Sequence, residues 1–258
     1  MTERIDGYMV VGGKWHDFVS VRLELLKLVA EHEEVRVKVS TNYEDTEAIA
    51  ASSFLISYTC DVRPSVSAQH AIGDWVRGGG RWMALHGTNS ALDGVVVRKP
   101  TGVESPRCFP DWAQLLGSQF VAHPVIQPYL VEIADPGHWL VTGIEAFSTI
   151  DDELYLSEYH NREALHPLLH TTWSGDAAGF QERDWSIATR GTDDHLVMYV
   201  KDEGNGAVLY NTLGHCRGHY DMVPVLPYYP KIERGSWDRP EYYELLRRSI
   251  RWALGATA

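Results

Sequence analysis

Short apolar runs alternate with amphipathic segments through the first ninety residues of this 258-residue chain. The runs at 8–11, 54–58 and 81–85 are typical of buried strands, because each is short and bounded by glycine or polar residues. Segments 19–31 and 65–77 carry apolar residues at helical spacing. Strands separated by helices form right-handed βαβ units, so the sequence predicts an α/β fold with a parallel sheet.

The second half of the chain contains more strand-like segments than helical ones. Asn205-Gly206 lies between two such segments and indicates a hairpin, and a helix is expected over 240–254. No shift in composition marks a linker, so we expect one domain over residues 1–258, whose mostly parallel sheet is extended by further strands. The segments expected to be extended are 128–134, 153–159, 166–173, 186–190, 195–201 and 207–212.

Two long segments, 92–110 and 219–239, show neither helical nor strand periodicity. Structureless loops longer than about 15 residues are uncommon in compact domains and are often lids or binding loops. A plain surface insertion or a contact between copies in a homo-oligomer explains them equally well.

The formal net charge of −12 disfavours nucleic acid and anionic membrane surfaces as partners. We find no uncharged apolar stretch of the roughly 18 residues that a membrane helix needs, and no signal-peptide pattern at Met1. Three widely spaced cysteines without a CxxC pair fit a reducing compartment better than a disulfide framework. These features predict a cytoplasmic protein.

Three histidines, His86, His123 and His215, each stand where an apolar run ends. Side chains at strand ends converge in parallel sheets, so a shared site is expected there. His86 occupies the strand-to-turn position of a nucleophile elbow, although histidine is a better base or ligand than covalent nucleophile. The alternative is that each histidine only caps its strand by hydrogen bonding.

A carboxylate completes a candidate metal site. His86, His123 and His215 with Glu153 form a set that zinc and similar divalent ions accept. The spacing is not diagnostic, because the four ligands come from distant segments. The same residues without an ion would form a histidine–carboxylate acid–base pair. His16 could reach the same pocket with Asp17 orienting it, or it could simply precede a helix that Asp17 caps.

Several familiar catalytic patterns do not occur. We find no GxSxG motif for a serine hydrolase and no GxGxxG fingerprint, so no nucleotide cofactor is expected. Cys60 follows an apolar run, yet no cysteine occupies a strand-to-helix elbow.

Five stretches occur in order over most of the chain: GGKWHDF at 12–18, GGGRWMALHG at 78–87, LGSQFVAHP at 116–124, DDELY at 151–155 and GAVLYNTLGH at 206–215. Together they resemble the ThuA-like family, named for trehalose utilisation. The family is similar to the class I glutamine amidotransferases, which implies a flavodoxin-like three-layer α/β/α fold. His86 stands near the amidotransferase cysteine, so this departure argues against glutamine hydrolysis. The segment 222–239 is a second departure, since we expect relatives to be shorter there.

The resemblance implies a role in sugar catabolism, and we expect an enzyme acting on a keto-sugar or a glycoside by hydrolysis, elimination or hydration. A keto group acidifies the neighbouring C–H, so a divalent ion, most simply zinc, or a histidine–carboxylate pair would suit such chemistry. The alternative is a catalytically silent sugar-binding or regulatory protein. The candidate catalytic residues are His86, Glu153, Asp152 and His16, and the candidate substrate contacts are Trp15, Asn89, Tyr155 and Trp237.

Overall fold

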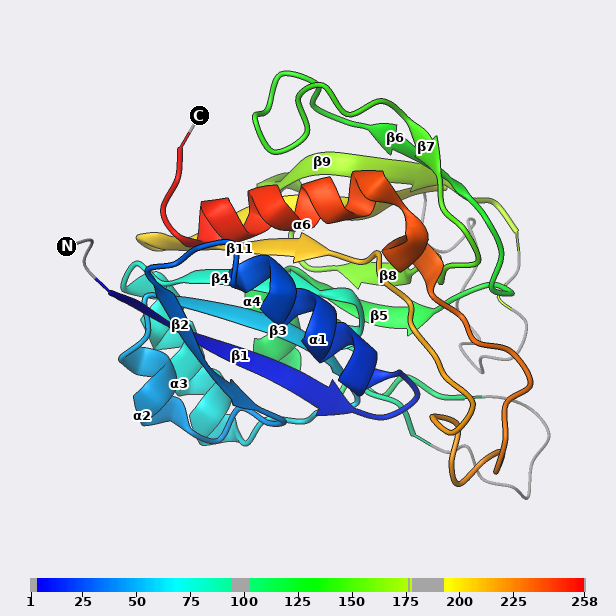
Figure 1. Cartoon of the computed structure of the whole chain (residues 1–258), viewed down its shortest axis with the longest axis horizontal. Helices are drawn as coiled ribbons and strands as arrows, with labels where there is room; N and C mark the ends of the chain where they lie inside the picture. The colour runs from blue at the N-terminus through cyan, green and yellow to red at the C-terminus, as the bar shows by residue number, and fades with distance from the viewer. Residues whose placement is uncertain (1–3, 94–102, 176, 178–192, 258) are drawn as a thin grey trace.

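A computed structural model describes residues 4–93, 103–175, 177 and 193–257. Within these ranges a nine-stranded sheet has the strand order β2-β1-β3-β4-β11-β10-β9-β6-β7 (Figure 1). Neighbouring strands of its first part run parallel, which confirms the predicted α/β class. This part comprises β2 (Val35–Ser40), β1 (Ile5–Gly13), β3 (Phe54–Cys60), β4 (Arg81–Leu85) and β11 (Gly206–Asn211).

Antiparallel strands extend the sheet beyond β11. They are β10 (Asp194–Glu203), β9 (Leu165–Thr172), β6 (Leu130–Ile133) and β7 (Phe147–Ser148). A second, two-stranded antiparallel sheet pairs β5 (Ser118–Ala122) with β8 (Leu156–Tyr159). The strand predicted over 186–190 lies outside the described residues.

Helices cover both faces of the sheet, which gives three layers (Figure 1). Two apolar clusters, one on each face, hold the layers together, because every helix has one buried side. One face carries α1 (Phe18–Val29) and α6 (Pro240–Ala253), and the other carries α2 (Thr46–Ala50), α3 (Val66–Arg77) and α4 (Pro110–Leu116). Short 3₁₀ turns form η1 (His86–Asn89), η2 (Arg162–Ala164) and η3 (Gly235–Asp238).

Local chemistry explains the first βα unit. All seven residues of β3 are buried, as expected of a parallel strand covered on both faces. Helix α1 begins after Asp17, whose carboxylate accepts a hydrogen bond from the Ser20 amide at 2.9 Å. Val21 and Leu25 of α1 are fully buried against the sheet. The predicted helix at 19–31 is therefore confirmed, with Asp17 as its cap.

The carboxyl ends of the parallel strands lie at one edge of the sheet, where α/β proteins bind ligands. β1 leaves this edge through Gly13, whose φ is +124°. A Cβ atom at Gly13 would lie 1.9 Å from the Cys60 carbonyl oxygen, so only glycine lets the chain turn here. The residues after β1, β4 and β11 carry His16, His86 and His215. Among the described helices, none is long and apolar enough to cross a membrane.

Candidate metal centre

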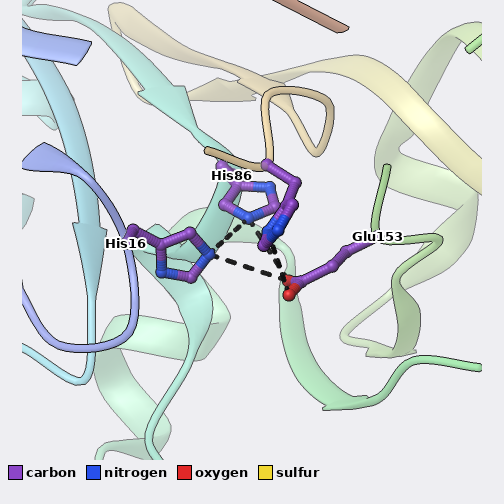
Figure 2. Close-up of side chains that lie close together, drawn as sticks. His16, His86 and Glu153 are labelled. Atoms are coloured by element: carbon purple, nitrogen blue, oxygen red, sulfur yellow. Dashed lines mark hydrogen bonds and ion pairs between the residues drawn. The ribbon is translucent and has the colours of Figure 1, made fainter. Parts of the chain in front are cut away.

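Four buried side chains meet at this edge of the sheet: His16, His86, Glu153 and His215. One nitrogen or oxygen from each lies within 4.8 Å of the others. Figure 2 shows His16, His86 and Glu153 pointing toward one another from three different segments. Each residue is at most 4% exposed, so the group is shielded from bulk water. Such a set of three imidazoles and a carboxylate could hold a metal ion.

The distances within the group are short. The Nε2 atom of His86 lies 2.9 Å from Nε2 of His16 and 3.4 Å from Oε2 of Glu153. His16 Nε2 lies 3.7 Å from the same Glu153 oxygen. His215 presents its other nitrogen, Nδ1, at 3.0 Å from Glu153 Oε1. Two nitrogen ligands of tetrahedral zinc would lie about 3.3 Å apart, which is close to this spacing.

Backbone carbonyls fix which nitrogens of His16 and His86 face the centre. Nδ1 of His86 donates to the Thr212 carbonyl at 2.8 Å, and Nδ1 of His16 donates to the Lys14 carbonyl at 3.1 Å. A carbonyl can only accept, so each Nδ1 carries a hydrogen and each neutral ring directs an Nε2 lone pair at the other. Two lone pairs at 2.9 Å repel. A cation between them, either a proton or a metal ion, removes that repulsion.

Glu233 fixes the third imidazole. Its Oε2 accepts from His215 Nε2 at 2.8 Å, which leaves Nδ1 of that ring facing Glu153. Arg217 and Tyr229 also donate to the Glu233 carboxylate, at 3.1 and 2.7 Å. A carboxylate on the outer nitrogen of a histidine is the usual partner of a metal-bound imidazole. Sequence reasoning missed Glu233 as a site residue, although it lies in the 219–239 segment singled out as a candidate binding loop.

Burial and neighbouring charges separate the protonation states of the group. Burial lowers the pKa of His16 to about 3, which keeps that ring neutral. Burial opposes protonation of His215, but Glu153 and Glu233 outweigh it and raise the pKa of His215 to about 9. Burial also disfavours ionised Glu153, yet His215 and His123 hold its pKa well below the usual range. Without an ion, the centre thus pairs an ionised Glu153 with a protonated His215, and a bound metal ion would take the place of the His215 proton.

His123 lies next to the group rather than within it. Its Nε2 is 3.6 Å from Glu153 Oε1, and its Nδ1 donates to the Pro124 carbonyl at 2.6 Å. Its side chain is 20% exposed. The sequence assigned His123 as a metal ligand, but the compact group contains His16 instead, because the turn after β1 brings His16 against His86.

Three other candidates have structural partners elsewhere. Asp152 accepts from the His215 amide at 3.0 Å and the Ser236 amide at 2.8 Å, so its carboxylate holds the backbone beside the centre. Asn89 donates to the Ser118 hydroxyl at 2.8 Å, and Trp237 donates to the Gly214 carbonyl at 2.8 Å. None of the three is among the described residues that line the adjoining cavity. These contacts give all three a structural role, and their predicted roles in catalysis and substrate contact stay predictions.

A cavity of about 340 Å³ opens beside the centre, and His16, His123 and Glu153 form part of its wall. Trp15 and Tyr155, both predicted substrate contacts, also line it. The Tyr155 ring packs over His86 with 4.7 Å between centroids. Trp15 and His86 hold φ at +73° and +46°, a conformation that costs free energy and is concentrated at functional sites.

Fold and centre together define a three-layer α/β protein with a buried histidine–carboxylate group at the carboxyl edge of its sheet. The chain belongs to the ThuA family, described as trehalose utilisation, whose model matches residues 9–227. The predicted resemblance is thereby confirmed.

Solved structures agree with the flavodoxin-like fold. A chain described as ThuA-like from Bacteroides uniformis is 14% identical, with a TM-score of 0.64 over 98% of this chain and 93% of that one. A second, from Parabacteroides merdae, is also 14% identical, with a TM-score of 0.61 over 98% and 91%. A β-galactosidase from Rahnella sp. R3 is 13% identical with a TM-score of 0.54, covering 98% of this chain but 31% of the enzyme. At these identities the likeness shows the fold alone. No curated protein matches the sequence.

Proposed function

We propose that this protein is a metal-dependent enzyme of sugar utilisation that acts on a keto-sugar or a glycoside. The observation that carries the proposal is the group of His16, His86, His215 and Glu153, whose ligand atoms lie within 4.8 Å of one another. Outer hydrogen bonds fix which nitrogen each imidazole presents to the group. The ThuA family supplies the link to sugars. The cavity beside the group supplies the space for a small molecule.

Three imidazoles and one carboxylate fit zinc, and also iron, nickel or manganese. A five- or six-coordinate ion would keep a position for substrate beside four protein ligands. When bound, such an ion would polarise a carbonyl or activate water. In this proposal the sugar packs against Tyr155 and Trp15, which both line the cavity. His123, at the cavity side of Glu153, exchanges a proton with the substrate.

Metal analysis tests the ion directly. Protein purified without added metal is expected to contain one first-row ion per chain. A His86→Ala/His215→Ala double variant should lose that ion, whereas a His138→Ala/His166→Ala double variant, which removes two histidines outside the group, should retain it. Substoichiometric metal that neither pair of changes affects would refute the metal site.

A metal-free acid–base site is the second candidate, because His215 and Glu153 already form an ion pair at 3.0 Å. The two candidates differ in their response to chelator. Turnover of 3-keto glycosides that stops on chelation and returns with zinc supports the metal enzyme. Turnover that is indifferent to chelator supports the metal-free site, and no turnover of any keto-sugar or glycoside supports a silent binding protein.

A further inference from the structure

The cavity wall beyond the metal centre is apolar. Leu92, Phe120, Met222 and Val225 line the cavity together with Trp15 and Tyr155. The imidazole, carboxylate and guanidinium side chains of the described wall belong to the centre or adjoin it: His16, His123, Glu153 and Arg217. The cavity lining is therefore divided between the charged and imidazole groups of the centre and apolar side chains contributed by other segments.

From this division we infer that the substrate is a neutral glycoside whose aglycone, the group attached to the sugar, is small and apolar. The inference rests on the proposed function, because it takes the sugar ring to lie at the metal centre. It adds the chemical class of the other half of the substrate, which neither the family nor the centre specifies.

Hydrogen-bond capacity argues for a single sugar ring. Within the described part of the chain, two buried polar side-chain atoms of wall residues have no hydrogen-bond partner: Trp15 Nε1 and Ser90 Oγ. Ser90 is only 2% exposed, so its hydroxyl gains little from bulk water. These two groups can serve the hydroxyls of one ring. A second ring would lose the hydration of its hydroxyls against Leu92 and Val225 without new partners, which disfavours disaccharides.

Charge argues against a phosphorylated or acidic sugar. Arg217 is the one guanidinium in the described wall, and it is already engaged by Glu153 at 3.3 Å and Glu233 at 3.1 Å. An anionic substrate group would have to compete with both carboxylates for the same cation. Recognition of phosphate usually requires Arg or Lys groups free to bind it. A neutral substrate avoids this competition.

The size of the cavity is consistent with a glycoside that carries a small apolar aglycone. A cavity of about 340 Å³ is at the lower end of the range for small-molecule sites. It suits one sugar ring and a group such as phenyl. Burial of that group against Met222 and Val225 removes apolar surface from water and strengthens binding.

Calorimetric titration of the full-length, zinc-loaded protein tests the inference. The probes are the phenyl glucosides and methyl glucosides of both anomers, trehalose and phenol. A phenyl glucoside should bind at least about tenfold more tightly than the corresponding methyl glucoside and than trehalose. Equal affinities for phenyl glucoside, methyl glucoside and trehalose would overturn the aglycone inference and leave the proposed function standing.

Two further outcomes bear on the proposed function itself. Phenol binding as tightly as a phenyl glucoside would show that the sugar adds nothing and would overturn the carbohydrate assignment. Binding of none of the glycosides would overturn the carbohydrate assignment and the aglycone inference together. A phenyl preference in protein that takes up no zinc would refute the metal centre alone.

A pair of valine variants locates the effect in the wall. Val225→Ser should reduce the preference for phenyl over methyl glucoside to about threefold or less, because a hydroxymethyl group replaces apolar surface. Val223→Ser is the matched control, since Val223 lies two residues away and is 56% exposed. Equal loss in both variants, or no loss in Val225→Ser, would contradict the assignment of this wall to the aglycone.

Discussion

The orientation of single imidazole rings decides what this centre can do. The Nδ1 atoms of His16 and His86 each donate a hydrogen bond to a backbone carbonyl, and Nε2 of His215 donates to the Glu233 carboxylate. In all three, the outer hydrogen bond selects the nitrogen that faces Glu153. Histidines at strand ends could be found in the sequence, but the tautomer of His86 depends on the Thr212 carbonyl, which lies 126 residues further along the chain.

Glu233 offers a test of this orientation. Glu233→Gln removes the negative charge that accepts the His215 Nε2 hydrogen bond, and should weaken zinc affinity about 10- to 100-fold, as loss of an outer partner usually does. Competition with a fluorescent zinc chelator measures the change. Glu31→Gln, which alters an exposed ion pair with Arg247, is the control and should leave affinity unchanged. Equal affinity of the Glu233 variant and the unmodified protein would show that this carboxylate does not support the ligand.

A variant at Asp152 tests whether this carboxylate has a structural or a catalytic role. It accepts hydrogen bonds from the amides of His215 and Ser236. Asp152→Asn should lower the free energy of unfolding by about 2 kcal/mol, because charged hydrogen bonds to buried amides are weakened. Urea denaturation measures this, with Asp151→Asn as the neighbouring control. A variant with full stability and no activity would contradict this structural account and support the catalytic role predicted from the sequence.

At the scale of elements, the sequence predicted the βαβ units well because both periodicities are strong there. The strands at 8–11, 54–58 and 81–85 fall within β1, β3 and β4, and the helix at 240–254 matches α6. The short helices α2 and α4 were missed, since five and seven residues show too little periodicity. The pairing of β5 with β8 depends on tertiary packing and could not be read from either segment.

The turn after β1 explains why the compact group contains His16 rather than His123, which the sequence predicted as a ligand. Both histidines follow a strand, so the sequence could not rank them. The turn after β1, with Gly13 at φ +124° and Trp15 at φ +73°, folds His16 back against His86. This conformation is set by backbone contacts to β3 that have no local sequence pattern.

Two glycine variants measure how strongly that turn is constrained. Gly13→Ala combines an unfavourable φ with a Cβ only 1.9 Å from the Cys60 carbonyl oxygen, and should cost about 3 kcal/mol or more of unfolding free energy. Gly79→Ala has nearly the same φ, +123°, but no described neighbour within 4 Å of its Cβ. It should cost only about 1 kcal/mol. If urea denaturation gave both variants a similar loss of unfolding free energy, the close approach of a Cβ atom to the Cys60 carbonyl would not be what restricts position 13 to glycine.

At the scale of the molecule, the centre joins segments that are far apart in the chain. His16, His86, Glu153 and His215 follow or connect four different strands, so an ion bound to them would link both halves of the sheet. Ligands that bind only the folded state raise its stability. The predicted homo-oligomer and the role of residues 219–239 in it stay predictions.

Chelation should therefore lower the thermal stability of the whole protein. At zinc concentrations about 100-fold above the dissociation constant, bound metal contributes about 3 kcal/mol, which corresponds to roughly 5–10 °C in Tm for a chain of this size. Differential scanning calorimetry with and without chelator measures the shift. The His86→Ala/His215→Ala variant should show no shift on chelation, and an unchanged Tm in the unmodified protein would indicate that no ion contributes.

Anomalous X-ray diffraction from crystals of protein purified without added metal tests the centre most directly. Data collected on both sides of the zinc edge, and of the iron, nickel and manganese edges, identify the ion. We expect one anomalous peak within about 2.3 Å of His16 Nε2, His86 Nε2, His215 Nδ1 and a Glu153 carboxylate oxygen. Crystals with those four side chains in place and no anomalous peak among them, even after soaking in zinc, would contradict the proposal that these residues bind a metal ion.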